Sequence, residues 1–295
     1  MRENGPVTSA TRQPETPAAT LPPRLIATDL DGTLLRDDKS VSERTVAALA
    51  AAEEAGIEVF FVTGRPARWM DVVSDHVHGH GLAICGNGAA VVDLHGGPGA
   101  HRFVKVRELA RENALDAVRL VREAAPGTVF AIEQTYGFYQ EPAYPKLHME
   151  IPDTLASAEK LLAPDAPGAG EPVLKILAFH HELDPDAFLT VARDAVGDRA
   201  TITRSSPSAL LEISGPGVSK ASTLELCCAE RGISPEEVVA FGDMPNDVEM
   251  LTWAGTSYAM GNAHPAVIAA ASGRTVANNE DGVAVVIEKI LAERL

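Results

Sequence analysis

Two aspartates at the end of an apolar segment carry the strongest chemical signal in this sequence of 295 residues. Residues 25–28 look like a buried strand, and Asp29 and Asp31 follow it, with Gly32 and Thr33 next. Alternation along a strand sends both carboxylates to one side, where they repel each other unless a cation or a shared proton intervenes. The pair favours a hard metal ion and a reaction that needs a nucleophile and an acid or base. A solvated turn is the alternative, because Asp and Gly are ordinary turn residues.

Other strand-like segments also end in polar or glycine-rich residues. They end in Thr63-Gly64-Arg65, in Gly86-Asn87-Gly88 and in Gly242-Asp243, while Lys220 opens a helix after the run 214–217. Taken singly, the threonine could cap a helix, the lysine could be solvated and the others could be turn residues. Ligands of an open parallel sheet bind beyond the carboxyl ends of its strands. The joint placement therefore favours one shared site.

Strands alternate with helices in both halves of the chain, which predicts an α/β fold with a Rossmann-like parallel sheet. The predicted helices cover residues 42–55, 66–77, 220–230, 246–253, 265–271 and 281–291. Between the halves lies an expected α+β insertion, with strands at 103–106, 129–133, 173–179 and 200–203 and helices at 108–123 and 184–196. We expect residues 24–89 and 209–295 to form the core domain and residues 90–208 the inserted domain.

The overall composition excludes some classes of partner. With 25 basic and 41 acidic residues, the chain has a net charge of -16, which argues against nucleic acid and anionic membranes as partners. No segment reads as a membrane span or as a secretory signal. The three cysteines (Cys85, Cys227 and Cys228) suggest packed, reduced thiols and a cytoplasmic protein. Residues 1–23, rich in Pro, Thr, Ala and Ser, are expected to be a disordered tail.

With these motifs in order, the sequence resembles the haloacid dehalogenase-like hydrolase superfamily, in its Cof-type branch with a C2 cap. The first motif of that family, DxDGT, is complete at residues 29–33, and the fourth, GDxxND, at residues 242–247. Thr63 in a TGR context matches the second motif and Lys220 the third. Ala221 and Pro245 depart from the usual pattern, but Pro245 suits the first turn of a helix and neither change affects the chemical groups.

The resemblance implies phosphoryl transfer through an aspartyl-phosphate intermediate. Asp29 would be the nucleophile and Asp31 the general acid and base, while Thr63 and Lys220 would bind phosphate oxygens. Mg²⁺ would be held by the Asp29 carboxylate, the Asp31 backbone carbonyl and Asp243, with Asp247 in support. The remaining substrate-binding or phosphate-binding candidates are Gly64, Arg65, Asn87 and Asn246.

The resemblance also implies that the insertion is a cap that closes over the site and selects the substrate. Its candidate contacts are Glu133, Tyr136, Tyr139 and His148, although tyrosines on a half-exposed sheet often only pack. The expected function is a Mg²⁺-dependent phosphatase of small phosphorylated metabolites, such as a sugar phosphate or a phosphorylated cofactor. A phosphomutase and a catalytically silent metabolite-binding protein are the alternatives. The sequence does not identify the substrate or the oligomeric state.

Overall fold

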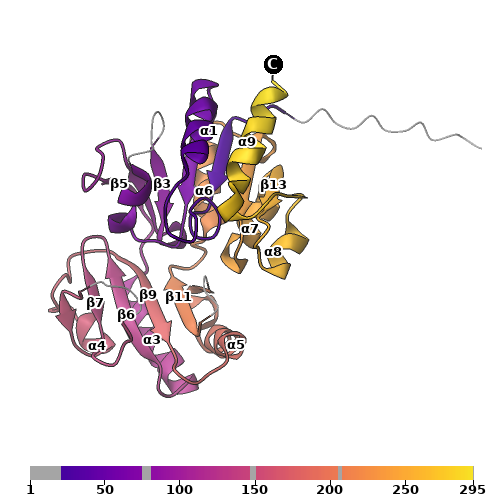
Figure 1. Cartoon of the computed structure of the whole chain (residues 1–295). Helices are drawn as coiled ribbons and strands as arrows, with labels where there is room; N and C mark the ends of the chain where they lie inside the picture. Colours follow the sequence, from indigo (N-terminus) through magenta and orange to yellow (C-terminus); the bar gives the residue numbers. More distant parts are fainter. Residues whose placement is uncertain (1–20, 75–80, 147–150, 205–207, 295) are drawn as a thin grey trace, which may run out of the picture.

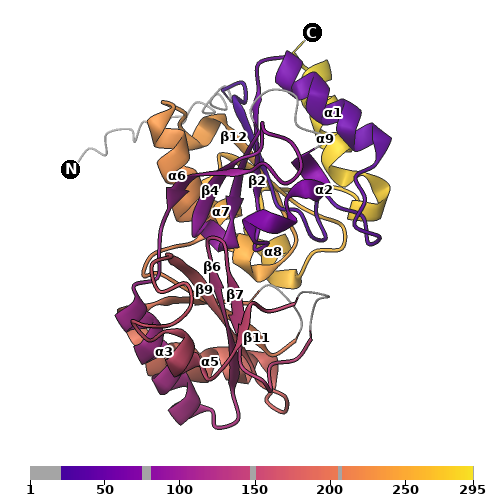
Figure 2. The ribbon, with the colours of Figure 1, turned by 90° about the vertical axis from the view of Figure 1, so that its left-hand side faces the viewer.

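The chain folds around two β-sheets, each in its own lobe. The structure, a computed structural model, describes residues 21–74, 81–146, 151–204 and 208–294. Figure 1 shows the larger sheet, formed by both ends of the chain, above the smaller one, which is formed by its middle. Figure 2 shows the same two lobes from the side. We call the lobe of the larger sheet the core and the lobe of the smaller sheet the cap.

The core sheet is parallel at its centre, as the alternation of strands and helices predicts. Its spatial order is β14 (Gly273–Arg274), β13 (Thr256–Ala259), β12 (Val238–Gly242), β1 (Leu25–Thr28), β2 (Glu58–Val62), β3 (Leu82–Cys85), β4 (Ala90–Asp93) and β5 (Arg102–Val106). The first six strands in this order pair in parallel. The last two, β4 and β5, extend the sheet in antiparallel fashion beyond β3.

Helices cover both faces of the core sheet, so its central strands are buried on both sides. Alternate residues of β2 show this, because Phe61 packs into the cluster on one face and Phe60 into the cluster on the other. The first face carries α1 (Glu43–Glu54), α2 (Asp71–Ser74) and α9 (Gly282–Ala292). The second carries α6 (Lys220–Glu230), α7 (Val248–Trp253) and α8 (Pro265–Ala270).

Local sequence signals explain where two of these helices begin. The Ser42 side chain accepts a hydrogen bond from the backbone N–H of Thr45 at the start of α1, and Ser219 caps α6 in the same way through Ser222. The long helix predicted from Pro66 is wrong, because the chain forms a 3-10 turn at Ala67–Trp69 and then the short α2. The end of that prediction, at 75–77, lies outside the described residues.

The cap is a largely antiparallel sheet with helices packed on one face. Its spatial order is β10 (Thr201–Thr203), β11 (Leu210–Ser214), β9 (Val173–Phe179), β6 (Val129–Gln134), β7 (Phe138–Gln140) and β8 (Thr154–Leu155). The helices α3 (Arg111–Ala124), α4 (Ala158–Leu161) and α5 (Pro185–Val196) share a buried cluster with alternate residues of the central strands, such as Phe130 and Ile176. The opposite face of the sheet carries no such helix among the described residues.

Three strands lie in a different lobe from the one expected. Residues 90–93 and the strand predicted at 103–106 belong to the core sheet as β4 and β5, and β11 at residues 210–214 belongs to the cap. For β4 and β5 the reason is a tight turn at Gly86–Gly88, which folds the chain back into a hairpin with β3 instead of releasing it toward the cap. The expected limits of 90 and 208 therefore shift, and the strands of the cap lie between residues 129 and 214.

Two linkers, residues 107–110 and 215–219, cross between the lobes side by side. A Cβ atom added to Gly215 would lie 2.7 Å from the carbonyl oxygen of Glu108, so only glycine allows this approach. The Arg107 guanidinium donates to the hydroxyls of Ser222 and Thr223 in the first turn of α6. Both linkers are thus attached at the beginning of that helix.

Two further expectations concern the cysteines and membranes. Cys85, Cys227 and Cys228 are all buried, as expected for packed thiols, and burial raises the pKa of Cys228 to about 12. Across the described parts of the chain, every helix is too short or too polar to cross a lipid bilayer.

The valines of α5 test how much the cap depends on its helix-side cluster. Val196 is fully buried, whereas Val191 on the same helix is 36% exposed. We expect Val196→Ala to lower the free energy of unfolding by about 2–3 kcal/mol, since it removes two methyl groups and leaves a cavity. Val191→Ala should change it by less than about 0.5 kcal/mol. Urea unfolding of both variants measures the difference, and equal midpoints would contradict this packing.

Candidate active site

The residues that follow four neighbouring strands meet at one edge of the core sheet. Strands β12, β1, β2 and β3 are adjacent and parallel, so their carboxyl ends lie side by side. Asp29 follows β1, Thr63 follows β2, and Asp243 follows β12. Lys220, the first residue of α6, reaches the same edge from the second linker. The structure thus brings together the aspartates, threonine and lysine that the motifs identified.

Lys220 is the buried cation of this edge. Its Nζ atom donates to Oδ1 of Asp29 and to Oδ1 of Asp247, both at 2.6 Å, and its side chain is 1% exposed. Burial alone would lower the pKa of Lys220, but Asp247 and Asp29 outweigh it and raise the pKa above its usual range. Burial, with Asp247 and Asp243 nearby, raises the pKa of Asp29 in spite of the lysine.

Asp243 and Asp247 complete an acidic cluster with Asp29. Single carboxylate oxygens of the three residues all lie within 4.8 Å of one another. Burial and the carboxylate of Asp247 raise the pKa of Asp243 to about 7. Thr33 donates its hydroxyl hydrogen bond to Asp243 at 3.1 Å, and Gly32, at φ 77°, leaves room for the carboxylate. A Cβ atom on Gly32 would lie 2.3 Å from Oδ2 of Asp243.

The acidic cluster fits a divalent cation. Three buried carboxylates share one lysine, and burial together with the neighbouring carboxylates raises the pKa of Asp29 and of Asp243. Oxygen donors of this kind are the ligands of Mg²⁺ in proteins. Asp247 already uses both oxygens, one for Lys220 and the other for the backbone N–H groups of Asp243 and Met244. Asp29 and Asp243 are therefore the better cation ligands, with Asp247 orienting Lys220.

The carboxylate of Asp31 does not join this cluster, although alternation along a strand predicts that it points to the same side as that of Asp29. Strand β1 ends at Thr28, so alternation no longer governs the direction of Asp31. Its oxygens accept from Nε and Nη2 of Arg65 at 2.6 and 2.8 Å and from Nζ of Lys39 at 2.8 Å. Burial opposes ionisation, but these cations outweigh it and lower the pKa of Asp31 to about 2.

Thr63 and the residues around it form a short hydrogen-bonded loop after β2. The Thr63 hydroxyl accepts a hydrogen bond from the backbone N–H of Arg65 at 3.0 Å, and Asn87 N–H donates to the Thr63 carbonyl at 3.0 Å. The Asn246 amide donates to Oδ1 of Asn87, also at 3.0 Å. Asn246 lines the cavity, and the buried Asn87 supports it from behind in a left-handed turn, with φ 55°.

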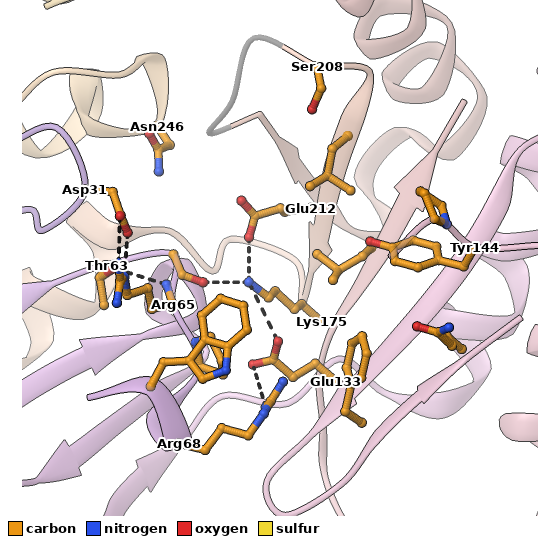
Figure 3. A pocket seen from close by; sticks show the side chains of 18 of the residues that line it. Asp31, Thr63, Arg65, Arg68, Glu133, Tyr144, Lys175, Ser208, Glu212 and Asn246 are labelled. Atoms are coloured by element: carbon orange, nitrogen blue, oxygen red, sulfur yellow. Dashed lines mark hydrogen bonds and ion pairs between the residues drawn. The ribbon is translucent and has the colours of Figure 1, made fainter. Parts of the chain in front are cut away.

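A cavity of about 1040 Å³ lies between this edge and the cap. The core contributes Asp29, Asp31, Thr63, Gly64 and Arg65 to its lining. Figure 3 shows this end of the cavity on one side and Tyr144 of the cap on the other, with Lys175 between them. Lys175 Nζ donates to the backbone carbonyl of Gly64 at 2.6 Å, so the cap directly contacts the loop after β2.

Of the three predicted cap contacts that the structure describes, one lines the cavity. Glu133 does so, whereas Tyr139 points into the helix-side cluster because it lies opposite Ile132. Tyr136 is 75% exposed and packs edge-on against Phe103 of the core. His148 lies outside the described residues.

Sequence reasoning missed several lining residues. They are Lys39, Arg68, Trp69, Lys175 and Glu212. No motif marks them. The only available signal was the charge of Lys175 and of Glu212 within otherwise apolar strands.

The fold and the site together define a hydrolase of the haloacid dehalogenase-like class. The chain matches the family of haloacid dehalogenase-like hydrolases over residues 26–287 and belongs to it, as the motifs indicated. It is 30% identical to the 5-amino-6-(5-phospho-D-ribitylamino)uracil phosphatase YitU of Bacillus subtilis, over 89% of this chain and 95% of the relative. It is 31% identical to the HMP-PP phosphatase of Yersinia enterocolitica, over 82% and 85%. The chain is a phosphatase of this family.

Solved structures show the same fold. A haloacid dehalogenase-like hydrolase from B. subtilis is 25% identical, with a TM-score of 0.75, and the match covers 90% of this chain and 99% of that chain. BT1666 of Bacteroides thetaiotaomicron, described among the phosphatases of this superfamily, is 23% identical, with a TM-score of 0.76 and coverage of 93% and 97%. The combination of an α/β core with a cap is therefore the fold of this family.

The ion pairs of Lys220 should be important for stability as well as chemistry. We expect Lys220→Met to lower the free energy of unfolding by about 3–5 kcal/mol, because it leaves buried carboxylates without their cation. Lys289→Met is the matched control, since that lysine side chain is 71% exposed and should contribute less than about 0.5 kcal/mol. Chemical denaturation of both variants gives the values. A loss of similar size in both would show that the buried pairs contribute little.

Proposed function

We propose that the protein is a Mg²⁺-dependent phosphatase of small phosphorylated metabolites that works through an aspartyl phosphate on Asp29. The observation that carries this proposal is the position of Asp29, a buried carboxylate between Lys220 and Asp243 that faces the cavity. The named activities of the relatives, which concern phosphorylated biosynthetic intermediates, support the substrate class. The metal ligands would be Asp29, Asp243 and the backbone carbonyl of Asp31, and the bound ion would neutralise phosphoryl charge.

In the first step, a carboxylate oxygen of Asp29 attacks phosphorus while the bond from phosphorus to the leaving oxygen breaks. Lys220 and Thr63 hold the other phosphate oxygens through the change of geometry. Asp31 gives its proton to the leaving oxygen. In the second step, water attacks phosphorus, Asp31 takes up its proton, and the bond to Asp29 breaks to give inorganic phosphate.

Asp31 can act as an acid only after its ion pairs have changed. Its low pKa comes from Arg65 and Lys39, which therefore have to turn away before Asp31 can hold a proton. A bound phosphate ester offers both cations a stronger anionic partner, since it carries up to two negative charges. We propose that Arg65 and Lys39 move to the substrate on binding and thereby prepare Asp31 for proton transfer.

Phosphate release tests the reaction. With Mg²⁺, a panel of sugar phosphates, nucleotides and pyridoxal phosphate should yield inorganic phosphate from at least one ester, and EDTA should stop the release. Asp29→Asn should lower the rate by at least about a thousandfold, because the amide is no nucleophile. Asp194→Asn, on the exposed side of α5, is the matched control and should leave the rate unchanged. Near-normal turnover by Asp29→Asn would exclude the nucleophile assignment.

Thermal unfolding tests the metal site independently of any measurement of phosphate release. Mg²⁺ should raise the melting temperature of the wild type, because an ion that binds only the folded state stabilises it. Asp243→Asn should lose most of this increase, whereas Asp194→Asn should keep it. Sodium chloride at the same ionic strength separates ion binding from screening. Equal Mg²⁺ shifts in the wild type and in Asp243→Asn would remove Asp243 from the ligand set.

A cytoplasmic location and the absence of nucleic-acid partners stay predictions from composition.

A further inference from the structure

The tight turn at Gly86–Gly88 holds the loop after β2 in place through its backbone. The N–H of Gly86 donates to the carbonyl of Arg65 at 2.9 Å. The next N–H, that of Asn87, donates to the carbonyl of Thr63 at 3.0 Å. Both ends of the short segment that carries the Thr63 hydroxyl are therefore bound to this turn.

The same turn is attached to the beginning of α6. The Thr223 hydroxyl donates to the carbonyl of Gly88 at 2.8 Å. A Cβ atom on Gly88, which has φ 104°, would overlap the carbonyl oxygen of Ser219, so only glycine allows the turn to approach the helix this closely. Lys220 follows Ser219 directly. The turn thus fixes the first turn of α6 as well as the loop after β2.

The side chain of Asn87 connects the turn to a third segment of the site. Asn246, in the fourth motif after β12, donates from Nδ2 to Oδ1 of Asn87 at 3.0 Å. An amide nitrogen carries two hydrogens, so the second one is available to a ligand. Figure 3 shows Asn246 at the end of the cavity that also carries Asp31 and Thr63. Asn246 is therefore placed to bind a phosphate oxygen while Asn87 holds its amide.

The stability of the turn does not explain the amide of Asn87. This side chain is 2% exposed, and its Nδ2 atom has no hydrogen-bond partner among the residues that the structure describes. A buried donor without a partner destabilises the folded state. The backbone of Asn87 has φ 55° and ψ 33°, a conformation that glycine adopts without strain. Glycine would thus form the same turn without an unpaired donor, and the contact with Asn246 is the feature that requires the amide.

We propose that Asn87 is a positioning residue that acts through Asn246, by holding the Asn246 amide in the orientation in which it meets the phosphoryl group. This inference rests on the proposed phosphatase activity and adds to it a residue that touches no substrate atom. The backbone of the turn fixes Thr63, and the side chain of Asn87 fixes Asn246. Two groups that bind one phosphate are thus held by a single turn, which keeps them in place before the substrate arrives.

The variant Asn87→Gly tests the amide alone, because glycine keeps the left-handed backbone and its N–H. We expect kcat/KM for the best ester of the panel to fall by about tenfold, the effect of one misplaced hydrogen bond to a charged group. The melting temperature should stay within about 3 °C of that of the wild type, since the unpaired donor is removed together with the bond. A fall of more than about 10 °C would show that the amide is structural and would overturn the inference.

Asn113→Gly is the matched control for this variant. Asn113 lies in the first turn of α3 and is not one of the residues that line the cavity. The same change of residue type there should leave kcat/KM within about twofold of the wild-type value. A tenfold loss in the control as well would overturn the inference, because the effect would then not be specific to the turn.

A double-mutant cycle tests whether Asn87 acts through Asn246. In the background of Asn246→Ala, the change Asn87→Gly should lower kcat/KM by less than about twofold, because the contact between the two side chains is already lost. The same tenfold loss in both backgrounds would overturn the inference, since Asn87 would then act independently of Asn246. Wild-type turnover by Asn87→Gly would overturn it too.

Melting temperatures separate this inference from the phosphatase proposal. Mg²⁺ alone should raise the melting temperature of Asn87→Gly as much as that of the wild type, because the change leaves Asp29 and Asp243 in place. Inorganic phosphate added with Mg²⁺ should raise it further in the wild type, and this second increase should fall by about half or more in Asn87→Gly. Equal phosphate-dependent increases in both proteins would overturn the inference.

Absence of phosphate release from every ester by the wild type would overturn the phosphatase proposal. The phosphate-dependent increases in melting temperature would still decide the role of Asn87, because they depend on phosphate binding and not on turnover.

Discussion

The buried lysine at the start of α6 is the interaction on which the rest of the site depends. Three acidic side chains at one edge of a sheet, away from water, would repel one another and favour unfolding. Lys220 pairs with two of them at 2.6 Å and holds them in one orientation. It does not neutralise all of them, and the negative charge that remains makes this edge of the sheet suitable for a metal ion, whose own charge would attract a phosphate ester. Stability and chemistry thus rest on one cation.

The core and the cap contribute different parts of such a site. The core supplies the reacting groups from the ends of parallel strands, whose positions are fixed by a sheet buried on both faces. The cap supplies a second sheet with one face packed under helices and the other turned to the cavity. Because these faces consist of alternate residues of the same strands, a change on the cavity side need not disturb the packing under the helices.

The sequence was sufficient to predict which groups lie together at the edge of the core sheet but not what surrounds them. Asp29, Thr63 and Asp243 could be placed together because each follows an apolar strand, and parallel strands end at a common edge. The direction of the Asp31 carboxylate could not be predicted, because alternation stops where β1 ends and the side chain pairs with Arg65. The cap residues could not be assigned, since whether Glu133 or Tyr139 faces the cavity depends on the register of a hairpin, which local patterns do not specify. The placement of β5 depended in the same way on a turn between strands.

The linkers attach the cap sheet to the core near the first residue of β9. Leu109 in the first linker donates its backbone N–H to the carbonyl of Val173, the first residue of β9. Along β9, the residues Lys175, Leu177 and Phe179 follow at increasing distance from this attachment to the linker. A rigid rotation of the cap about the linkers would displace each residue in proportion to its distance from the axis, so Lys175 would move less than Phe179. Such a rotation would change the cavity least beside Lys175, which contacts the loop after β2.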